Sequence, residues 1–392
     1  MSFDFDKVIP RRNTHSQKWD SMEARLGLSD PDTLPMWVAD MDFAAPPAVG
    51  EYLANKIAHG VYGYFGEDAD YKEAICNWMR TRHQFDVDPD WLVTTHGVVA
   101  GVGVSLQAFS ELGDGVVVFS PVYHAFGNTI RAASRKLIES ELNVVDGRYE
   151  MDLETLQTQI DTKTKIVVLC SPHNPGGRVW SRDELIALCK FCERNDLILI
   201  SDEIHHDLVF DGKKHWVTAN AYPEIADRLV TLTAATKTFN IAGCLTGNAI
   251  ISNKAMRSKF KSVLAGCGSL SPNGIGVEMV TAAYSAGADW VDAVVPYIQA
   301  NRDLLDEALV KIVPGVKVMK LEATYLAWYD FSDTVYSAEQ ATDLIENTAK
   351  IGTSRGPSFG KGGETWLRFN IACPRATLED AIARLRRAFG NQ

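Results

Sequence analysis

The sequence predicts an α/β fold with a mainly parallel sheet, helices on both faces of that sheet, and a smaller α+β unit. Short segments that are apolar throughout, such as KIVVLC (165–170) and LILIS (197–201), alternate with helical segments. A strand that is apolar on both faces has to be covered on both faces, which is typical of parallel sheets. The pattern then changes to long helices from about 253 to 313, followed by short strands, so we expect a second unit.

Each element of the large unit has its own signal in the sequence. After two helices within 48–83, strands are expected at 91–95, 116–120, 135–141, 165–170, 197–203 and 228–235. Helices are expected at 98–112, near 125–133 and at 181–195. Ser181 followed by Glu184 forms a capping box, which marks the start of the last of these helices.

The length of 392 residues predicts two or three domains. Prolines at positions 10, 31, 35, 46 and 47 interrupt any long helical or strand pattern in the N-terminal segment. We therefore expect this segment to form an arm or lid. We expect an arm at 1–45 that packs with the small domain, a large α/β domain at 46–290 and a small α+β domain at 291–392.

The composition narrows the classes of function. The net charge is −11, and an acidic surface repels phosphate backbones, so nucleic acid is not an expected partner. The N-terminus lacks the pattern of an export signal, and no apolar run approaches the ~20 residues that span a bilayer. The seven cysteines are scattered, which favours free thiols and a cytoplasmic protein. The C-x-x-C pair Cys189 and Cys192 is better explained by an amphipathic helix than by redox or metal chemistry.

Open parallel sheets bind ligands beyond the carboxyl ends of their strands, so the residues at those ends are candidates. Gly97, Val98 and Val99 open a helix, where backbone N–H groups can bind an anion. The glycines there lack the G-x-G-x-x-G spacing of a dinucleotide site. Tyr123 can stack on a flat cofactor, or it can simply lie at the edge of the hydrophobic core. Asn174 lies in a loop made rigid by prolines and glycines, which favours a functional role over a plain turn.

Charged residues end further strands. Asp202 ends an apolar strand, where a buried carboxylate needs a partner such as the protonated pyridine nitrogen of pyridoxal phosphate (PLP). Asp202, His205, His206 and Asp207 also form a candidate metal cluster. However, consecutive residues point in different directions and no further histidine-rich segment completes a site, so no metal is expected.

Two positively charged residues, Lys237 and Arg368, lie in apolar stretches of the sequence. Desolvation at a strand end would lower the pKa of Lys237 and make its amine a nucleophile suited to Schiff-base chemistry, although an ordinary surface lysine also fits the residue type. Thr236 offers a hydroxyl for a phosphate. Arg368, between Leu367 and Phe369, needs an anion, which is either a substrate carboxylate or a structural ion-pair partner.

The chain also resembles a known family along nearly its whole length. In order, the matching segments are TTHGVV, PVYHAF, SPHNPGGRVWS, LILISDEIHHDL, AATKTFNIAG and LRFNIACP. They resemble fold-type I PLP enzymes of the aspartate aminotransferase superfamily, which implies a sheet of the seven-stranded type. MWVADMDF (36–43), GVYGY (60–64) and SDEIHHDL (201–208) more narrowly resemble the MalY/PatB-type cystathionine β-lyases, or C–S lyases.

The resemblance implies a role for each cofactor residue. Lys237 would bind PLP as a Schiff base and move the Cα proton, and Asp202 would pair with the pyridine nitrogen. Asn174 would bond the 3-oxygen, and Tyr123 would stack on the ring and join the catalytic set. The rest of the implied cofactor site is Gly97, Val98, Val99, Thr236, His205 and, from a neighbouring subunit, Tyr62.

The resemblance implies a substrate site as well. Arg368 would bind the α-carboxylate, helped by Asn174, Tyr64 and the backbone of Val38, Ala39 and Asp40. Either Tyr62 or Tyr64 would reach the neighbouring subunit, with helix spacing favouring Tyr62, so a homodimer is implied. Ala234 and Leu245 depart from related aminotransferases, which often have a hydroxyl residue and an arginine there for the phosphate.

The implied reaction is β-elimination from L-cystathionine, a related L-cysteine S-conjugate or cysteine, giving a thiol, pyruvate and ammonia. Two alternatives stay open. A class I/II aminotransferase shares every step up to loss of the Cα proton, and residue types do not separate it from a lyase. A regulatory binding protein could use the same scaffold.

Overall fold

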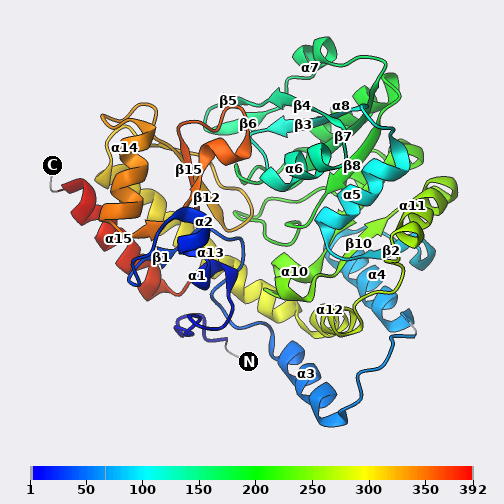
Figure 1. Ribbon diagram of the computed structural model, residues 1–392, viewed down its shortest axis with the longest axis horizontal. Coiled ribbons are helices and arrows are strands. Elements are labelled where there is room, and N and C mark those ends of the chain that lie inside the picture. The colour runs from blue at the N-terminus through cyan, green and yellow to red at the C-terminus, as the bar shows by residue number, and fades with distance from the viewer. Residues whose placement is uncertain (1–2, 67, 391–392) are drawn as a thin grey trace.

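The computed structural model describes residues 3–66 and 68–390, and it confirms the predicted fold class. Figure 1 shows a large sheet with its helices on the right and a smaller sheet on the left. The large sheet has seven strands in the order β2-β10-β9-β8-β7-β3-β4. Their bounds are β2 Leu92–Thr95, β3 Gly115–Ser120, β4 Lys136–Glu141, β7 Thr164–Cys170, β8 Ile198–Asp202, β9 Leu229–Thr233 and β10 Gly247–Ile250.

Strands β4, β3, β7, β8 and β9 run parallel, as the continuous apolar segments predict. Strand β10 is antiparallel to both of its neighbours, β2 and β9. This strand was not among those expected, because the four residues Gly247–Ile250 are too short to show a periodicity of their own.

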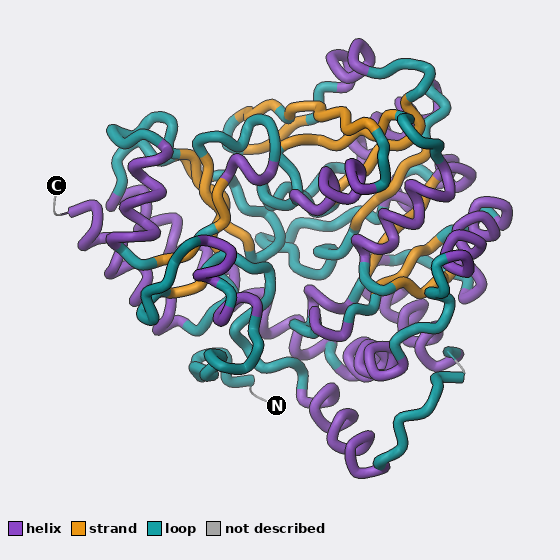
Figure 2. The backbone as a smooth tube through the Cα atoms, in the orientation of Figure 1, coloured by secondary structure: helices purple, strands orange, loops and turns teal. Residues whose placement is uncertain are grey.

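Both faces of the central strands of the large sheet are buried, which explains why β3 and β7 are apolar over most of their length. In β7, Ile166 and Val168 pack in one cluster with helices α5, α6 and α11, whereas Val167 and Leu169 pack in another with α7 and α8. This alternation is the two-residue period of a strand applied to two apolar environments. Figure 2 shows the orange strands between the purple helices. The bounds are α5 Val98–Phe109, α6 His124–Ala132, α7 Leu153–Gln159, α8 Arg182–Arg194 and α11 Lys254–Gly266.

The predicted capping box begins α8: Ser181 accepts from the backbone N–H of Glu184, and the Glu184 carboxylate accepts from that of Ser181. The other α-helices and strands between residues 46 and 287 are α3 Pro47–His59, α4 Ala69–His83, β5 Asn143–Val145, β6 Arg148–Glu150, α9 Thr218–Ala221, α10 Ala235–Thr238 and α12 Gly274–Ala286. The boundary that we propose at 290 falls in the first turn of α13 Ala288–Ile312, so this proposal assigns most of that helix to the smaller unit.

The smaller unit is built on a four-stranded antiparallel sheet in the order β11-β12-β15-β14. Its elements are β11 Lys317–Val318, β12 Leu326–Asp330, α14 Ala338–Asp343, β14 Ser354–Arg355, β15 Trp366–Asn370 and α15 Arg375–Gly390. The N-terminal segment joins this unit, because β1 Leu34–Pro35 pairs with β13 Ile351–Gly352. Two short helices, α1 Gln17–Asp20 and α2 Met22–Leu26, interrupt its irregular course. None of the helices in residues 3–66 and 68–390 has the length and apolar character needed to cross a membrane.

Candidate active site

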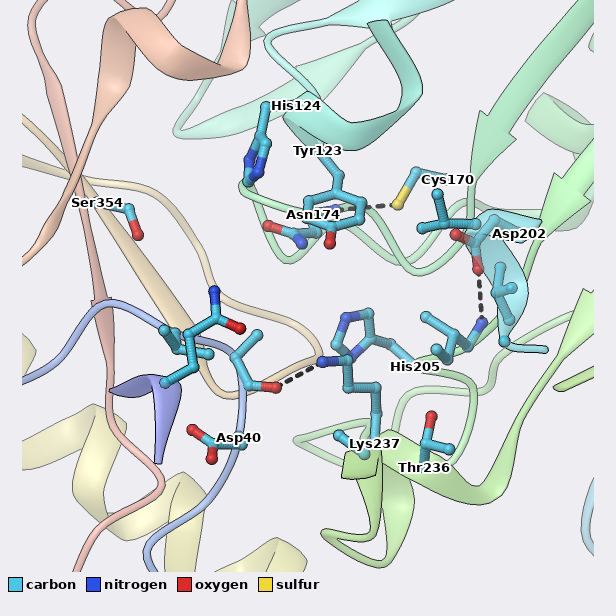
Figure 3. A pocket seen from close by; sticks show the side chains of 18 of the residues that line it. Asp40, Tyr123, His124, Cys170, Asn174, Asp202, His205, Thr236, Lys237 and Ser354 are labelled. Atoms are coloured by element: carbon cyan, nitrogen blue, oxygen red, sulfur yellow. Dashed lines mark hydrogen bonds between the residues drawn. The ribbon is translucent and has the colours of Figure 1, made fainter. Parts of the chain in front are cut away.

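A cavity of about 750 Å³ lies where the carboxyl ends of the large sheet meet the N-terminal segment and the small sheet. Figure 3 shows Tyr123 and Asn174 on one side of it and Lys237 and Thr236 on the other. Most of the predicted site residues line this cavity. They are Val38, Ala39, Asp40, Gly97, Val98, Val99, Tyr123, Asn174, Asp202, His205, Thr236, Lys237 and Arg368.

Lys237 projects into the cavity from α10, the single helical turn that follows β9. Its Nζ donates a hydrogen bond of 2.5 Å to the carbonyl oxygen of Ala39. Burial lowers the pKa of Lys237 to about 8, against a partial opposing effect of Asp40. A substantial fraction of the amine is therefore neutral near pH 8 and able to attack an electrophilic carbon.

Asp202 ends β8, and its side chain is buried beside the cavity. Among the described residues, the only hydrogen bond to the Asp202 carboxylate comes from the backbone N–H of Ile204, at 3.0 Å. Burial raises the pKa of this carboxyl group to about 7, and the hydrogen bond from Ile204 and the charge of Lys237 oppose this rise only in part. The site therefore favours a ligand that brings a positive charge or a proton donor to Asp202.

Arg368 lies in the middle of β15 and is 4% exposed. Its Nη1 donates to Asn174 Oδ1 at 2.9 Å, and its Nη2 donates to the Trp37 carbonyl oxygen at 2.8 Å and to Ser354 Oγ at 3.0 Å. Its Nε has no partner in the described part of the chain. Burial lowers the pKa of Arg368 to about 10. All of its partners are neutral, so this guanidinium can still bind a carboxylate.

The N-terminus of α5 forms the far wall of the cavity and suits a phosphate. Gly97 precedes the helix with a φ of +91°, a conformation that side chains rarely adopt, so glycine is required there. On the neighbouring strand, a Cβ on Gly247 would lie 2.9 Å from the Gly97 carbonyl carbon and 3.0 Å from Val98 N. The twelve-residue helix directs free backbone N–H groups and its dipole toward the cavity. The hydroxyl of Thr236 lines the same cavity.

His205 is 2% exposed and lies beside Lys237 in the cavity. Burial keeps its pKa well below the usual value, so the ring is neutral. Its Nδ1 has no partner among the residues that the structure describes. His206 and Asp207, which follow it, do not line the cavity and turn away from it.

Two predicted residues do not line the cavity of their own chain. Tyr62 and Tyr64 lie between α3 and α4 and are 60% and 105% exposed. Their role in a neighbouring subunit stays a prediction.

Eleven lining residues were not predicted as site residues: Gln17, Arg25, Trp37, His96, His124, Cys170, Ile204, Ala242, Gly243, Leu245 and Ser354. A further residue, Asn240, explains how residues 36–43 reach the site: its Nδ2 donates to the carbonyl oxygens of Met41 and Phe43, and its Oδ1 accepts from Met41 N. In the sequence, the one available signal for this role of Asn240 was that a polar residue lies three positions after Lys237.

The cavity thus combines an amine, a carboxylate, a guanidinium, an aromatic ring and a helix N-terminus. A flat, phosphorylated pyridine aldehyde matches these groups: the amine would reach its aldehyde carbon, the carboxylate its ring nitrogen and the helix its phosphate. The guanidinium would then remain for the carboxylate of an amino acid.

Comparison with known proteins places this site in a family. The model of the aminotransferase class I and II family matches residues 39–385. Cystathionine beta-lyase PatB of Bacillus subtilis is 39% identical over 385 residues, covering 98% of this chain and 99% of PatB. Protein MalY of Escherichia coli is 32% identical, covering 98% of each chain. The crystal structure of cystalysin from Treponema denticola, which contains a pyridoxal 5′-phosphate cofactor, superposes with a TM-score of 0.95 at 35% identity over 100% of both chains.

The match extends over most of the chain in sequence and over all of it in structure. The resemblance read from the motifs is therefore confirmed, and the chain belongs to the aminotransferase class I and II family.

Proposed function

We propose that this protein is a PLP-dependent carbon–sulfur β-lyase that cleaves L-cystathionine or a related L-cysteine S-conjugate to a thiol, pyruvate and ammonia. The observation that carries the proposal is that Asp202, Lys237 and Arg368 line one cavity, and none has an ion-pair partner among the described residues. The partners that these groups lack are a cation, an electrophilic carbon and a carboxylate. PLP with an α-amino acid supplies all three.

When bound, PLP acts as an electron sink for bonds broken at the substrate Cα. Lys237 would hold the cofactor through its Nζ, and the same amine, when free, would be the base that takes the proton from the substrate Cα. Asp202 would pair with the ring nitrogen and keep it protonated, and Asn174 and Tyr123 would hold the ring in place. Breaking the Cβ–S bond would release a thiolate, which takes up a proton and leaves as the thiol. Addition of water to the remaining three-carbon fragment would then give pyruvate and ammonia.

The choice of lyase over aminotransferase is supported by the relatives, since PatB carries the name cystathionine beta-lyase. The test is to incubate PLP-loaded enzyme with L-cystathionine and no keto acid, and to measure thiol, pyruvate and ammonia. A lyase gives many turnovers of all three in equal amounts. If product forms only after a keto acid is added, the protein is an aminotransferase.

Arg368→Lys is expected to raise KM for cystathionine, because lysine keeps the charge but cannot offer the paired donors of a guanidinium. The loss of one charge-assisted hydrogen bond predicts a fall in kcat/KM on the order of 10- to 100-fold. Arg387→Lys, on the exposed face of α15, is the matched control and should leave KM unchanged. An unaltered KM in Arg368→Lys would assign the substrate carboxylate to another group.

The outer part of the cavity suggests how the thiol half of the substrate is recognised. Arg25 and Gln17 line the cavity, and Arg25 is exposed to solvent. We propose that Arg25 attracts the distal carboxylate of cystathionine.

Arg25→Ala should therefore raise KM for cystathionine roughly 2- to 5-fold, as expected for an exposed ion pair. Steady-state kinetics with S-methyl-L-cysteine, which has no distal carboxylate, provide the control and should be unaffected. Equal effects on both substrates would contradict a role in distal recognition.

We further propose a cytoplasmic homodimer with shared active sites. The strongly exposed tyrosines of the 60–64 segment, Tyr62 and Tyr64, are apolar surface that a second copy would cover and bring to its own cavity. The seven free cysteines suit a reducing compartment.

A further inference from the structure

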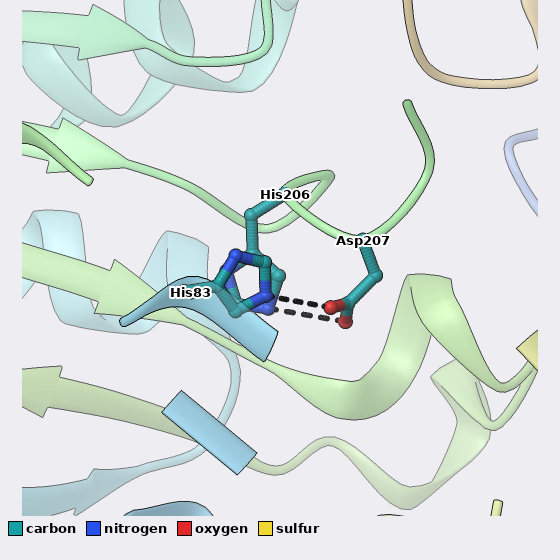
Figure 4. Close-up of side chains that lie close together, drawn as sticks. All are labelled: His83, His206 and Asp207. Carbon is teal, nitrogen blue, oxygen red and sulfur yellow. Dashed lines mark hydrogen bonds and ion pairs between the residues drawn. The ribbon is translucent and has the colours of Figure 1, made fainter. Parts of the chain in front are cut away.

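A polar network lies behind the lysine, centred on the carboxylate of Asp207, which is 1% exposed (Figure 4). Its Oδ1 accepts a hydrogen bond from Trp78 Nε1 at 3.0 Å and lies 2.7 Å from His83 Nε2. Its Oδ2 accepts from the Thr238 hydroxyl at 2.7 Å and lies 3.1 Å from His206 Nε2. Four neighbours therefore surround one buried carboxylate.

The spacing of His83, His206 and Asp207 would also suit a metal ion. Each carboxylate oxygen, however, already has a hydrogen-bond donor from the chain itself, which is the Trp78 indole N–H on Oδ1 and the Thr238 hydroxyl on Oδ2. Although burial alone raises the pKa of Asp207, the two histidines hold it well below its usual value. The carboxylate is thus compensated by the chain itself.

The network joins three segments of the chain that are far apart in sequence. Trp78 and His83 lie on α4, Asp207 lies on the loop that follows β8 and carries His205, and Thr238 directly follows Lys237 on α10. Asp207 and Thr238 themselves are not among the residues that line the cavity. Any effect on the reaction must therefore pass through the residues that they hold.

Helix α10 depends on such outside contacts, because it has only four residues, Ala235–Thr238. A single turn has little stability of its own. The bond from the Thr238 hydroxyl to Asp207 fixes one side of this turn, while the Lys237 amine on the other side reaches the Ala39 carbonyl oxygen.

We propose that Asp207 is a positioning residue that acts through Thr238 to orient Lys237 in the cavity. The inference rests on the proposed function, in which the Lys237 amine holds the cofactor and moves the Cα proton. A displacement of about 1 Å in a reacting group lowers the rate on the order of 100-fold, so a small rotation of α10 is sufficient for a measurable effect.

Thr238→Val tests the proposal, because it removes the hydroxyl and keeps the branched shape of the side chain. We expect kcat to fall roughly 10- to 100-fold with little change in KM. The pH at which the visible absorption of the bound cofactor changes should also shift, because the environment of the lysine nitrogen is altered. Thr238→Ser, which retains the hydroxyl, should restore both properties.

Thr218→Val is the matched control. Thr218 is fully buried on α9, its hydroxyl lies 2.9 Å from Ser201 Oγ, and it does not line the cavity. This variant should lose thermal stability but keep kcat and the absorption titration of the wild type. If Thr238→Val fails to fold, Thr238→Ala lacks the hydroxyl without placing a methyl group against the carboxylate and allows the same comparison.

Two results would overturn the inference, and they are distinguishable. If Thr238→Val loses stability like Thr218→Val but keeps kcat and the absorption titration, the Asp207 contact is only structural. If wild-type protein incubated with PLP never acquires visible absorption, the proposed function fails and this inference fails with it.

Discussion

Lys237→Ala is expected to abolish the lyase activity and the visible absorption of the PLP-loaded protein. Lys237 is the only lysine that lines the cavity, so within the described residues no other lysine amine is placed to hold the cofactor or to move the Cα proton. Loss of a general base alone costs about 10²- to 10⁴-fold, and loss of covalent attachment adds to it. We therefore expect a fall in kcat at or beyond the upper end of that range.

The measurements for Lys237→Ala are steady-state pyruvate release and the absorption spectrum after incubation with PLP. Lys259→Ala is the control, since Lys259 is an exposed lysine on α11. It should match the wild type in both measurements. A Lys237→Ala protein that still turned over cystathionine, with its absorption intact, would place the reactive amine elsewhere.

The sequence predicts the large sheet well because each parallel strand carries its own local signal. In Ile166–Leu169, the side chains on both faces of the strand are apolar. The two faces of β7 do pack in two separate hydrophobic clusters. The capping box at Ser181 is equally local, since both of its hydrogen bonds join residues three apart. Strand β10 was missed because it is short, and its antiparallel direction depends on pairing with β2 and β9.

The residues of the candidate site, like the strands, could be predicted where their signal is local in the sequence. Asp202, Lys237 and Asn174 could be found because each ends an apolar strand or lies in a loop that follows one, and strand ends of a parallel sheet converge. Arg25 and Ser354 could not, because they come to the cavity through tertiary packing of the arm and of the small sheet. Asp207 was considered only as a metal ligand, since the contact to Thr238 joins residues 31 apart.

Asp202→Asn is expected to lower kcat on the order of 10²- to 10³-fold, the typical effect of removing one preorganised electrostatic group. In the proposed site the Asp202 carboxylate would keep the ring nitrogen of PLP protonated, whereas a neutral amide of the same shape would not. Binding of PLP should survive, because Lys237 and the α5 N-terminus are unchanged. The control is Asp306→Asn, since burial also raises the pKa of Asp306, to about 6, and this residue does not line the cavity.

The same residue gives the unloaded protein a distinct pH dependence. Burial raises the pKa of Asp202 from its usual 3.8 to about 7, so the folded state holds its proton more tightly than the unfolded state does. Stability is then lost as the pH rises between these values, because only the folded protein has to ionise this carboxyl group in a buried place. Asp202→Asn lacks this loss, so its melting temperature relative to the wild type should be higher at pH 8 than at pH 5. PLP, by supplying the missing positive charge, should stabilise the wild type more at pH 8 than it stabilises the variant. If the difference in melting temperature between unloaded wild type and variant is the same at both pH values, Asp202 is already ionised and paired, and it cannot be the group that awaits the cofactor nitrogen.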